Sequence, residues 1–177
     1  MKMLSLDANA VLDLCYRFYG NEVFEALWEN LLSCISASQI RFYITSSIYQ
    51  EILSYIELHE LDVSIFEVFI KEYKVIFPES DEFGSKTLEL KETLLGFSAA
   101  RKSPHVTRDN YGDSDIVSFA KFLGNDAVVL TSETRSKILN WENPDHQRHI
   151  KVPNLCELFN VECMNWFMLF NYLGHKY

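Results

Sequence analysis

The sequence lacks a hydrophobic run long enough to cross a membrane. No stretch approaches the roughly 18 apolar residues that a membrane span requires, and no charged segment followed by an apolar run opens the chain as in a secretory signal. Both absences argue against a membrane partner. We therefore expect a soluble, cytoplasmic protein.

Cysteine is sparse, and the four cysteines form no recognisable motif. Cys15, Cys34, Cys156 and Cys163 are scattered, with no CxxC pair and no histidine at the spacing of zinc ligands. This spacing argues against a zinc module. We expect the four thiols to be reduced and mostly buried.

Internal repeats, low-complexity tracts and linkers are also absent. The 177 residues are 48% apolar and include 13 Phe, 9 Tyr and 3 Trp, which is typical of a well-packed globular protein rather than a disordered chain. A chain of this length can bury a substantial core. The sequence thus predicts a single domain spanning residues 1–177.

Basic residues are scarce in the first half of the chain. Residues 1–95 contain 7 Lys or Arg against 16 Asp or Glu, whereas residues 96–177 contain 9 of each sign, so the net charge of -9 arises entirely from the first half. Such a chain repels nucleic acid at long range and needs a local basic patch to bind it. The acidic half could instead dock a basic partner.

Short apolar segments alternate with helical patterns along the chain. One helix is predicted at residues 87–100, after an acidic loop at 78–84. Strands alternating with helices indicate an α/β fold whose mainly parallel central sheet is flanked by helices. The predicted strands are residues 2–6, 41–45, 74–77, 127–130, 150–153 and 161–164.

Residues 111–134 combine three acids with a helix and a strand. Asp113 and Asp115 immediately precede the apolar face of a predicted helix, where free N–H groups and the helix dipole favour anions. Glu133 lies just past the predicted strand 127–130. In a parallel sheet, groups beyond the carboxyl ends of the strands point into the crevice where ligands bind.

Two further acids lie after predicted strands. Asp7 directly follows residues 2–6, and Glu51 lies in the first turn of a helix where Ser47 and Gln50 have the spacing of a capping box. Carboxylates gathered at one edge repel each other, by roughly 4 kcal/mol per pair at about 4 Å and an effective dielectric near 20. A hard divalent cation relieves this repulsion, which favours Mg²⁺ or Mn²⁺ as cofactor.

The chain resembles PIN-domain nucleases in four segments. These are LSLDANAVLDL (4–14), SSIYQEIL (46–53), GDSDIVSFAKFLG (112–124) and VVLTSE (128–133). The tail KVPNLCELFNVECMNWFMLFNYLG (151–174) is similar to the ending of a PIN-like subgroup of unknown function (DUF4411-type) that is often found among toxin–antitoxin genes. Each motif is short, and the order and spacing of the set carry the resemblance.

This resemblance implies a PIN-like three-layer sandwich and a Mg²⁺- or Mn²⁺-dependent endonuclease that cuts RNA. It also implies a toxin whose partner is an antitoxin protein. Asn9 matches the small polar residue that commonly follows the first acid, but Ile116 and Val117 stand where the subgroup has Pro and an aromatic residue. The acids that match the four acidic positions of the PIN-domain family are, in chain order, Asp7, Glu51, Asp115 and Glu133.

The acids take different expected roles. Asp7 and Asp115 are predicted as direct metal ligands, and Glu51 as a ligand or a residue that positions the attacking water. Glu133 is predicted as an outer-shell or second-metal ligand. Asp113 stays open between a metal ligand and a helix N-cap, and the sequence does not separate one metal from two.

A polar loop at residues 101–110 precedes the acids and supplies basic side chains. These could bind the phosphates of an RNA strand, and a solvated loop is the alternative. The candidate substrate-binding residues are Asn9, Thr131, Arg101, Lys102 and Arg108, with His105 in the same loop.

Two other functions remain open. A phosphatase could form an aspartyl-phosphate on Asp7, although such enzymes use a second acid two residues later, where this chain has Asn9. A non-catalytic binding module on the same scaffold could dock a basic partner. Three aromatic residues near the C-terminus have helical spacing, namely Phe167, Phe170 and Tyr172. We expect them to pack in the core or to form the contacts of a homodimer.

Overall fold

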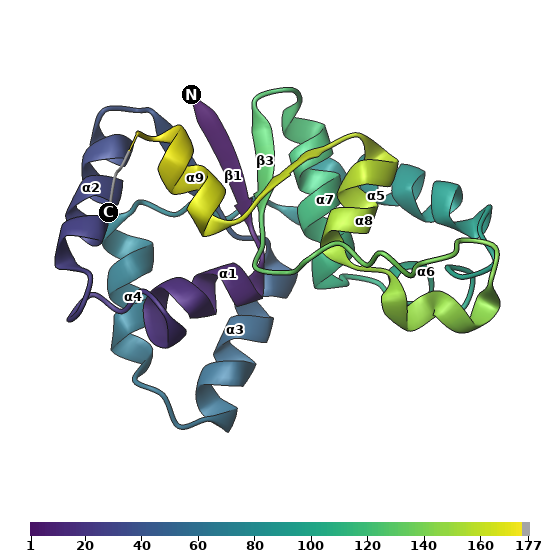
Figure 1. Ribbon diagram of the computed structural model, residues 1–177, viewed down its shortest axis with the longest axis horizontal. Coiled ribbons are helices and arrows are strands. Elements are labelled where there is room, and N and C mark those ends of the chain that lie inside the picture. Colours follow the sequence, from purple (N-terminus) through teal and green to yellow (C-terminus); the bar gives the residue numbers. More distant parts are fainter. Residues whose placement is uncertain (175–177) are drawn as a thin grey trace.

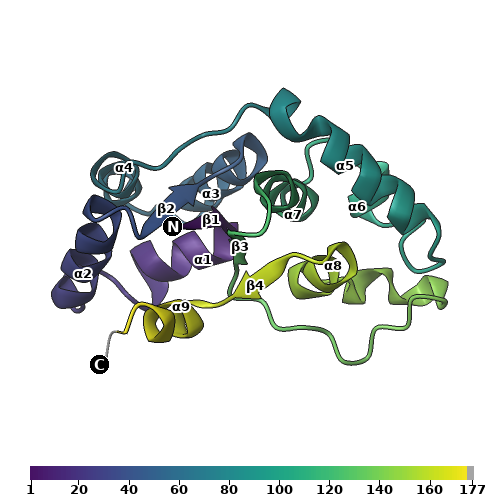
Figure 2. The same ribbon diagram turned by 90° about the horizontal axis from the view of Figure 1, so that it is seen from above.

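A sheet of four parallel strands runs through the centre of the computed structural model, which describes residues 1–174 (Figures 1 and 2). The strand at residues 2–6 lies between two others, so that Leu4 is opposite Phe42 on one side and Val128 on the other. All neighbouring strands are parallel, which confirms the predicted α/β fold class. The spatial order is β2 (Ile40–Tyr43), β1 (Lys2–Leu6), β3 (Ala127–Leu130) and β4 (Glu162–Met164).

The sheet lies between two groups of helices (Figures 1 and 2). α1, α2, α4 and α9 lie on one side, and α7 and α8 on the other, with α5 outside α7. α7 packs on β1 and β3 on one face, and because residues 4–6 and 127–130 are all buried, both faces of these two strands are covered. This arrangement is consistent with the expected three-layer sandwich. The helices are α1 (Ala8–Leu12), the π-helical turn η1 (Asp13–Arg17), α2 (Glu25–Ser36), α3 (Ser46–Leu58), α4 (Val63–Glu72), α5 (Ser80–Leu95), α6 (Pro104–Thr107), α7 (Gly112–Leu123), the 3₁₀ helix η2 (Pro144–His149), α8 (Val152–Phe159) and α9 (Trp166–Tyr172).

The carboxyl ends of the strands share one edge of the sheet. β1 runs directly into α1, and β2 runs into α3, so both helices begin at this edge. α7 ends shortly before β3 begins, so α7 runs back along the sheet and its first turn also lies at the carboxyl edge (Figure 1). The topology therefore gathers strand ends and helix starts at one place.

The aromatic C-terminal helix is only partly buried. Trp166 is 2% exposed and its indole Nε1 donates to the carbonyl of Ala10 at 2.8 Å, which fastens α9 to α1. Phe170 is also buried, whereas Phe167 is 69% and Tyr172 56% exposed. The predicted core contact is thus confirmed for Phe170 alone.

Some predicted segments differ from the structure. Residues 78–84 are not a loop, because α5 begins within them. Glu79 and Glu82 form a capping box in which the Glu79 N–H donates to Glu82 Oε1 at 3.0 Å. The predicted helix 87–100 is therefore shifted toward the N-terminus, and residues 150–153 are not a strand because α8 starts among them.

Two further local predictions need adjustment. The predicted strand at 74–77 is reduced to a single parallel bridge between Ile76 and Tyr43. α3 begins after Thr45, whose hydroxyl oxygen lies 3.1 Å from that of Ser47, and the predicted capping box is not formed.

Cys15, Cys34 and Cys156 are buried and Cys163 is partly exposed, and within residues 1–174 none of the four forms a disulfide. Within the described part of the chain, no helix combines the length and apolar character needed to cross a membrane.

Candidate metal centre

Asp7 lies at the carboxyl end of the central strand. Its side chain is buried, at 3% exposure, and Oδ2 accepts a hydrogen bond from Thr131 Oγ1 at 2.6 Å. Burial raises the pKa of Asp7 to about 6, with upward contributions from Glu133 and Glu51 and a lowering by the Thr131 hydrogen bond. The protein groups around Asp7 thus resist the ionisation of its carboxyl group.

Asp113, in the first turn of α7, interacts with three other acids. Burial, followed by the charges of Asp7, Glu133 and Glu51, raises the pKa of Asp113 to about 8, while Lys151 lowers it. Four carboxyl groups from four separate segments therefore share one electrostatic environment, which we call the acidic cluster (Asp7, Glu51, Asp113, Glu133). Such mutual repulsion is what a bound cation relieves.

Glu51 enters the acidic cluster from α3, where Gly112 leaves room for its carboxylate. Burial raises the pKa of Glu51, and the charge of Glu133 raises it further. A Cβ atom on Gly112 would lie 3.1 Å from Glu51 Oε2 and 2.8 Å from Ile48 Cδ1. Because the second distance is shorter than real Cβ contacts, any side chain at position 112 would force Ile48 Cδ1 to shift, and glycine avoids this crowding between α3 and α7.

Glu133 is held by three hydrogen bonds. Oε1 accepts from Lys151 Nζ at 2.9 Å, and Oε2 accepts from the Val152 N–H at 2.9 Å. Its backbone N–H donates to Thr131 Oγ1 at 3.0 Å, so Thr131 links Glu133 to Asp7. Val152 begins α8, and the carboxylate therefore lies at a helix N-terminus, where N–H groups favour an anion.

Asp115 lies on a different face of α7 from Asp113. Burial raises the pKa of Asp115, and this is partly offset by a hydrogen bond from Ser47 and by the charge of Lys91. Asp115 and Lys91 line a separate hollow of about 330 Å³. Residues two apart on an α-helix are roughly 200° apart around its axis, so one helix cannot direct both acids to one point. The structure thus brings Asp113, and not Asp115, to Asp7.

The side chains of the acidic cluster are not arranged as a finished coordination shell. Among residues 1–174, no three His, Cys, Asp or Glu side chains are placed so that they could hold a metal ion. The donor set nevertheless fits a hard divalent cation, because it consists of carboxylates and the pKa values of Asp7, Glu51 and Asp113 are raised. A metal ion would therefore bind with rearrangement of these side chains.

The three basic residues predicted to bind phosphates, Arg101, Lys102 and Arg108, differ in their surroundings. Arg101 is exposed and its Nε donates to the carbonyl of Leu95 at 3.1 Å, and Lys102 is exposed beside it. Burial, followed by charges of the acidic cluster, raises the pKa of Tyr111 to about 12, while Arg108 lowers it. Of the three basic residues, Arg108 is the one shown to interact with a neighbour of the acidic cluster.

Asn9 belongs to a network around Arg17. The Arg17 guanidinium donates to Asn9 Oδ1 at 3.1 Å, pairs with Asp13 at 3.3 Å and lies 4.7 Å from the centre of the Tyr55 ring. This network connects Asn9, the second residue of α1, to η1 and α3. The side chain of Asn9, two residues after Asp7, is therefore already bonded to the cation of Arg17.

His105 is not a source of positive charge for a phosphate. It is 2% exposed, its Nδ1 lies 3.4 Å from Ser114 Oγ, and its ring packs edge-on against Tyr111 with centroids 4.9 Å apart. Burial lowers the pKa of His105 to about 4, so the imidazole is neutral near pH 7. Its contacts position the loop that leads into α7.

Sequence reasoning missed Lys151 and Gly112. The hydrogen bond and charge of Glu133, followed by the charges of Asp113 and Asp7, raise the pKa of Lys151, which places its ammonium at the acidic cluster. No spacing rule connects Lys151 to an acid 18 residues earlier. For Gly112, a glycine directly before an acid at a helix start was the available signal.

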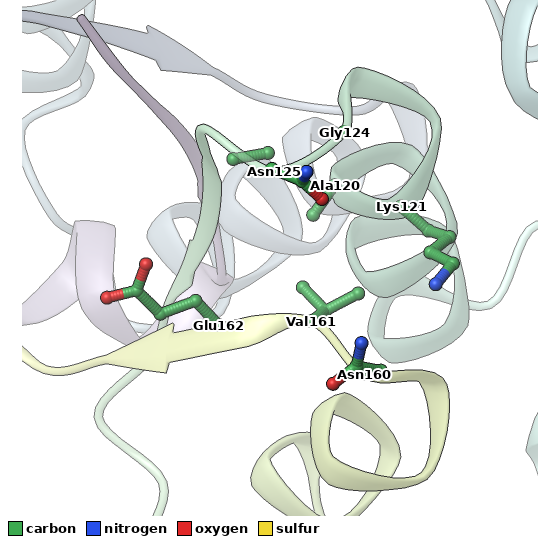
Figure 3. Close-up of a pocket in the computed structure, with 8 residues that line it drawn as sticks. Ala120, Lys121, Gly124, Asn125, Asn160, Val161 and Glu162 are labelled. Carbon is green, nitrogen blue, oxygen red and sulfur yellow. The ribbon is translucent and has the colours of Figure 1, made fainter.

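A second hollow lies at the opposite edge of the sheet, between the end of α7, the start of β3 and the segment that leads into β4 (Figure 3). Its volume is about 280 Å³, and Lys121 and Glu162 are the charged residues that line it. Glu162 forms an ion pair with Lys2. This hollow therefore offers no set of acidic metal donors.

One family profile matches nearly the whole chain. It is described as "Domain of unknown function (DUF4411)", and it matches residues 4–177. The chain belongs to this family. The match includes every segment that contributes to the acidic cluster. No curated protein matches the chain.

Proposed function

We propose that this protein is a metal-dependent endoribonuclease. The observation that supports this most strongly is the electrostatic convergence of Asp7, Glu51, Asp113 and Glu133 at the carboxyl edge of a parallel sheet. Open α/β sheets bind their ligands at that edge. The resemblance to PIN-domain nucleases favours phosphodiester hydrolysis of RNA as the reaction.

In this proposal Asp7 and Asp113 are the principal ligands of Mg²⁺ or Mn²⁺. When bound, the metal supplies a Lewis acid for a phosphate oxygen and lowers the pKa of the attacking water. Thr131 fixes the orientation of the Asp7 carboxylate through their 2.6 Å hydrogen bond. Glu51 acts as a further ligand or accepts a proton from that water, a role suited to a carboxyl group with a raised pKa.

The substrate we propose is single-stranded RNA, held by a few cations near the acidic cluster. A chain with a net charge of -9 does not attract nucleic acid at long range, so local contacts have to supply affinity. Arg108 near Tyr111 and Lys151 beside Glu133 can bind phosphates, and the partly exposed Tyr111 ring can stack on a base.

A protein partner is also proposed, namely the antitoxin of a toxin–antitoxin pair in the cytoplasm. A groove of about 460 Å³ is lined by residues that include Tyr16, Trp28, Ile65 and Val68, and Val23 on its rim is 78% exposed. Exposed apolar surface of this kind is typical of protein interfaces. A homodimer is the alternative, and the molecular mass of the isolated chain in solution separates the two.

RNA cleavage by the purified chain tests the proposed reaction. Mg²⁺ or Mn²⁺ is expected to support cutting of single-stranded RNA, and both EDTA and Asp7→Asn are expected to stop it without a change in the circular dichroism spectrum. Cutting that survives EDTA or Asp7→Asn would refute the proposal. A chain that neither binds metal nor cuts RNA would be a binding module, and a phosphoryl group trapped on Asp7 would indicate a phosphatase.

A further inference from the structure

Lys151 places a fixed positive charge in the acidic cluster. Its Nζ lies 2.9 Å from Glu133 Oε1, and the charges of Asp113 and Asp7 also act on it. Among the ion pairs formed within residues 1–174, this is the one that involves a cluster acid. Lys151 is the N-cap residue of α8, so the start of that helix sets the backbone position from which its side chain reaches Glu133.

Glu133 differs from the other three acids in its partners. Both of its carboxylate oxygens already accept hydrogen bonds, one from Lys151 and one from the N–H of Val152. A divalent ion on the same carboxylate would lie next to the ammonium group, and like charges repel. Asp7, Glu51 and Asp113, by contrast, form no ion pair with any described residue.

We propose that Lys151 takes the place of a second metal ion, so that the site binds a single divalent cation through Asp7, Glu51 and Asp113. This inference rests on the proposed function, because it concerns how the same site is charged. Glu133 is then a positioning residue that holds Lys151 and the first turn of α8.

Lys151 also remains available to the substrate. An ammonium group has three N–H donors, Glu133 uses one of them, and the side chain of Lys151 is 43% exposed. A phosphate oxygen of RNA can therefore accept a hydrogen bond from this group. Lys151 thus offers to the phosphate the positive charge that a second metal ion supplies in two-metal nucleases.

The number of bound Mn²⁺ ions tests the proposal. Calorimetric titration of the full chain, with electron paramagnetic resonance to count free Mn²⁺, is expected to give one ion per wild-type chain. Lys151→Met is expected to bind two, because Glu133 loses its cation and becomes a ligand. Lys151→Arg keeps the charge and is expected to bind one, as is the control Lys102→Met, which removes an exposed lysine.

Glu133→Gln provides a second test that does not depend on the folding of Lys151→Met. Loss of a residue that is not a ligand is expected to change the Mn²⁺ affinity far less than Asp113→Asn, which removes a ligand and is expected to lower it by at least about tenfold, the least that loss of an outer-shell partner typically costs. Circular dichroism verifies that both variants are folded.

The outcomes separate this inference from the proposed function. Two ions on the wild-type chain, one ion on both the wild type and a folded Lys151→Met, or equal losses of affinity in Glu133→Gln and Asp113→Asn would each overturn the role of Lys151. The metal-dependent nuclease would survive all three results. If the wild-type chain bound no Mn²⁺, both the proposed metal centre and the proposed function would be refuted.

Discussion

The two faces of α7 each carry one acid, and the surroundings of these acids are opposite in kind. Asp113 interacts with three other carboxyl groups, which add to the effect of burial and bring its pKa to about 8. Asp115 is more fully buried, but Ser47 donates a hydrogen bond to it and the charge of Lys91 favours its ionised form. An acid with its own donor and cation is satisfied, whereas an acid among acids favours a proton or a metal ion.

Activity should separate the two faces most clearly. Asp113→Asn is expected to lower metal-dependent RNA cleavage by about 1,000-fold or more, the scale of losing a charge-stabilising catalytic group. Asp115→Asn makes the same chemical change two residues away and is expected to retain activity within about threefold. Initial rates at saturating Mn²⁺ measure the difference. Equal losses in two folded variants would show that the two faces do not differ in function.

The pH dependence of stability gives the next largest effect. The carboxyl group of Asp113 has an ordinary pKa of 3.8 when unfolded and about 8 when folded. The folded state therefore binds a proton more tightly, so this stabilisation is complete below about pH 4 and is lost as pH rises through about 8. A tenfold difference in proton affinity between the two states corresponds to about 1.4 kcal/mol, and we expect a total of a few kcal/mol because the acids are coupled.

Urea unfolding in EDTA at pH 5 and pH 8 measures this effect. Wild type is expected to lose stability between the two values, and Asp113→Asn is expected to lose much less. Asp115→Asn should retain most of the wild-type pH dependence, because Ser47 and Lys91 already offset the burial of Asp115. A wild-type chain whose stability rises from pH 5 to pH 8 would contradict the raised pKa of Asp113.

Metal binding should oppose this loss of stability. At Mn²⁺ concentrations about 100 times the dissociation constant, binding to the folded state adds about 2.7 kcal/mol to the free energy of unfolding. We expect this gain at pH 8 in wild type and in Asp115→Asn, and little of it in Asp113→Asn. Thermal unfolding with and without Mn²⁺ measures the gain. A gain of the same size in Asp113→Asn would show that Asp113 is not a metal ligand.

The sequence predicted much of the fold but not the orientation of α7. The four strands and their parallel arrangement followed from apolar runs and strand–helix alternation, as did the positions of Asp7, Glu51 and Glu133 after β1, β2 and β3. Helical periodicity indicates that Asp113 and Asp115 do not both point into the same site, but it does not indicate which of the two does. The choice depends on packing, and residues 114–120 of α7 are all buried, so no polar face indicates which side meets the sheet.

Lys151 and α5 show two other limits of sequence reasoning. Lys151 reaches Glu133 because η2 and the start of α8 fold back to the sheet edge, and that path depends on tertiary contacts. α5 begins in the acidic segment at 78–84, where the capping box between Glu79 and Glu82 outweighs the loop-like composition. The capping residues could have been recognised from their spacing, whereas the position of Lys151 could not.

A glycine on each side of α7 allows the comparison to be made without changing any charge. Gly112 faces the acidic cluster, where an added Cβ would lie 2.8 Å from Ile48 Cδ1. We expect Gly112→Ala to lower the free energy of unfolding by about 1–3 kcal/mol through overpacking and to weaken Mn²⁺ binding by displacing Glu51. Adding Ile48→Val removes Cδ1 and should restore stability more than Mn²⁺ affinity, because the contact with Glu51 remains.

Gly84 is the matched glycine on the Asp115 side, and it should give the smallest effect, with the opposite sign. It lines the same hollow as Asp115, it lies within α5, and an added Cβ there would meet no atom within 4 Å. Gly84→Ala is therefore expected to stabilise the chain by about 0.5–1 kcal/mol, because alanine is the better helix former. Mn²⁺ affinity should not change, since this hollow lies apart from the acidic cluster. Urea unfolding and calorimetry on the same samples measure both quantities, and weaker Mn²⁺ binding in Gly84→Ala would show that the two sides of α7 are coupled.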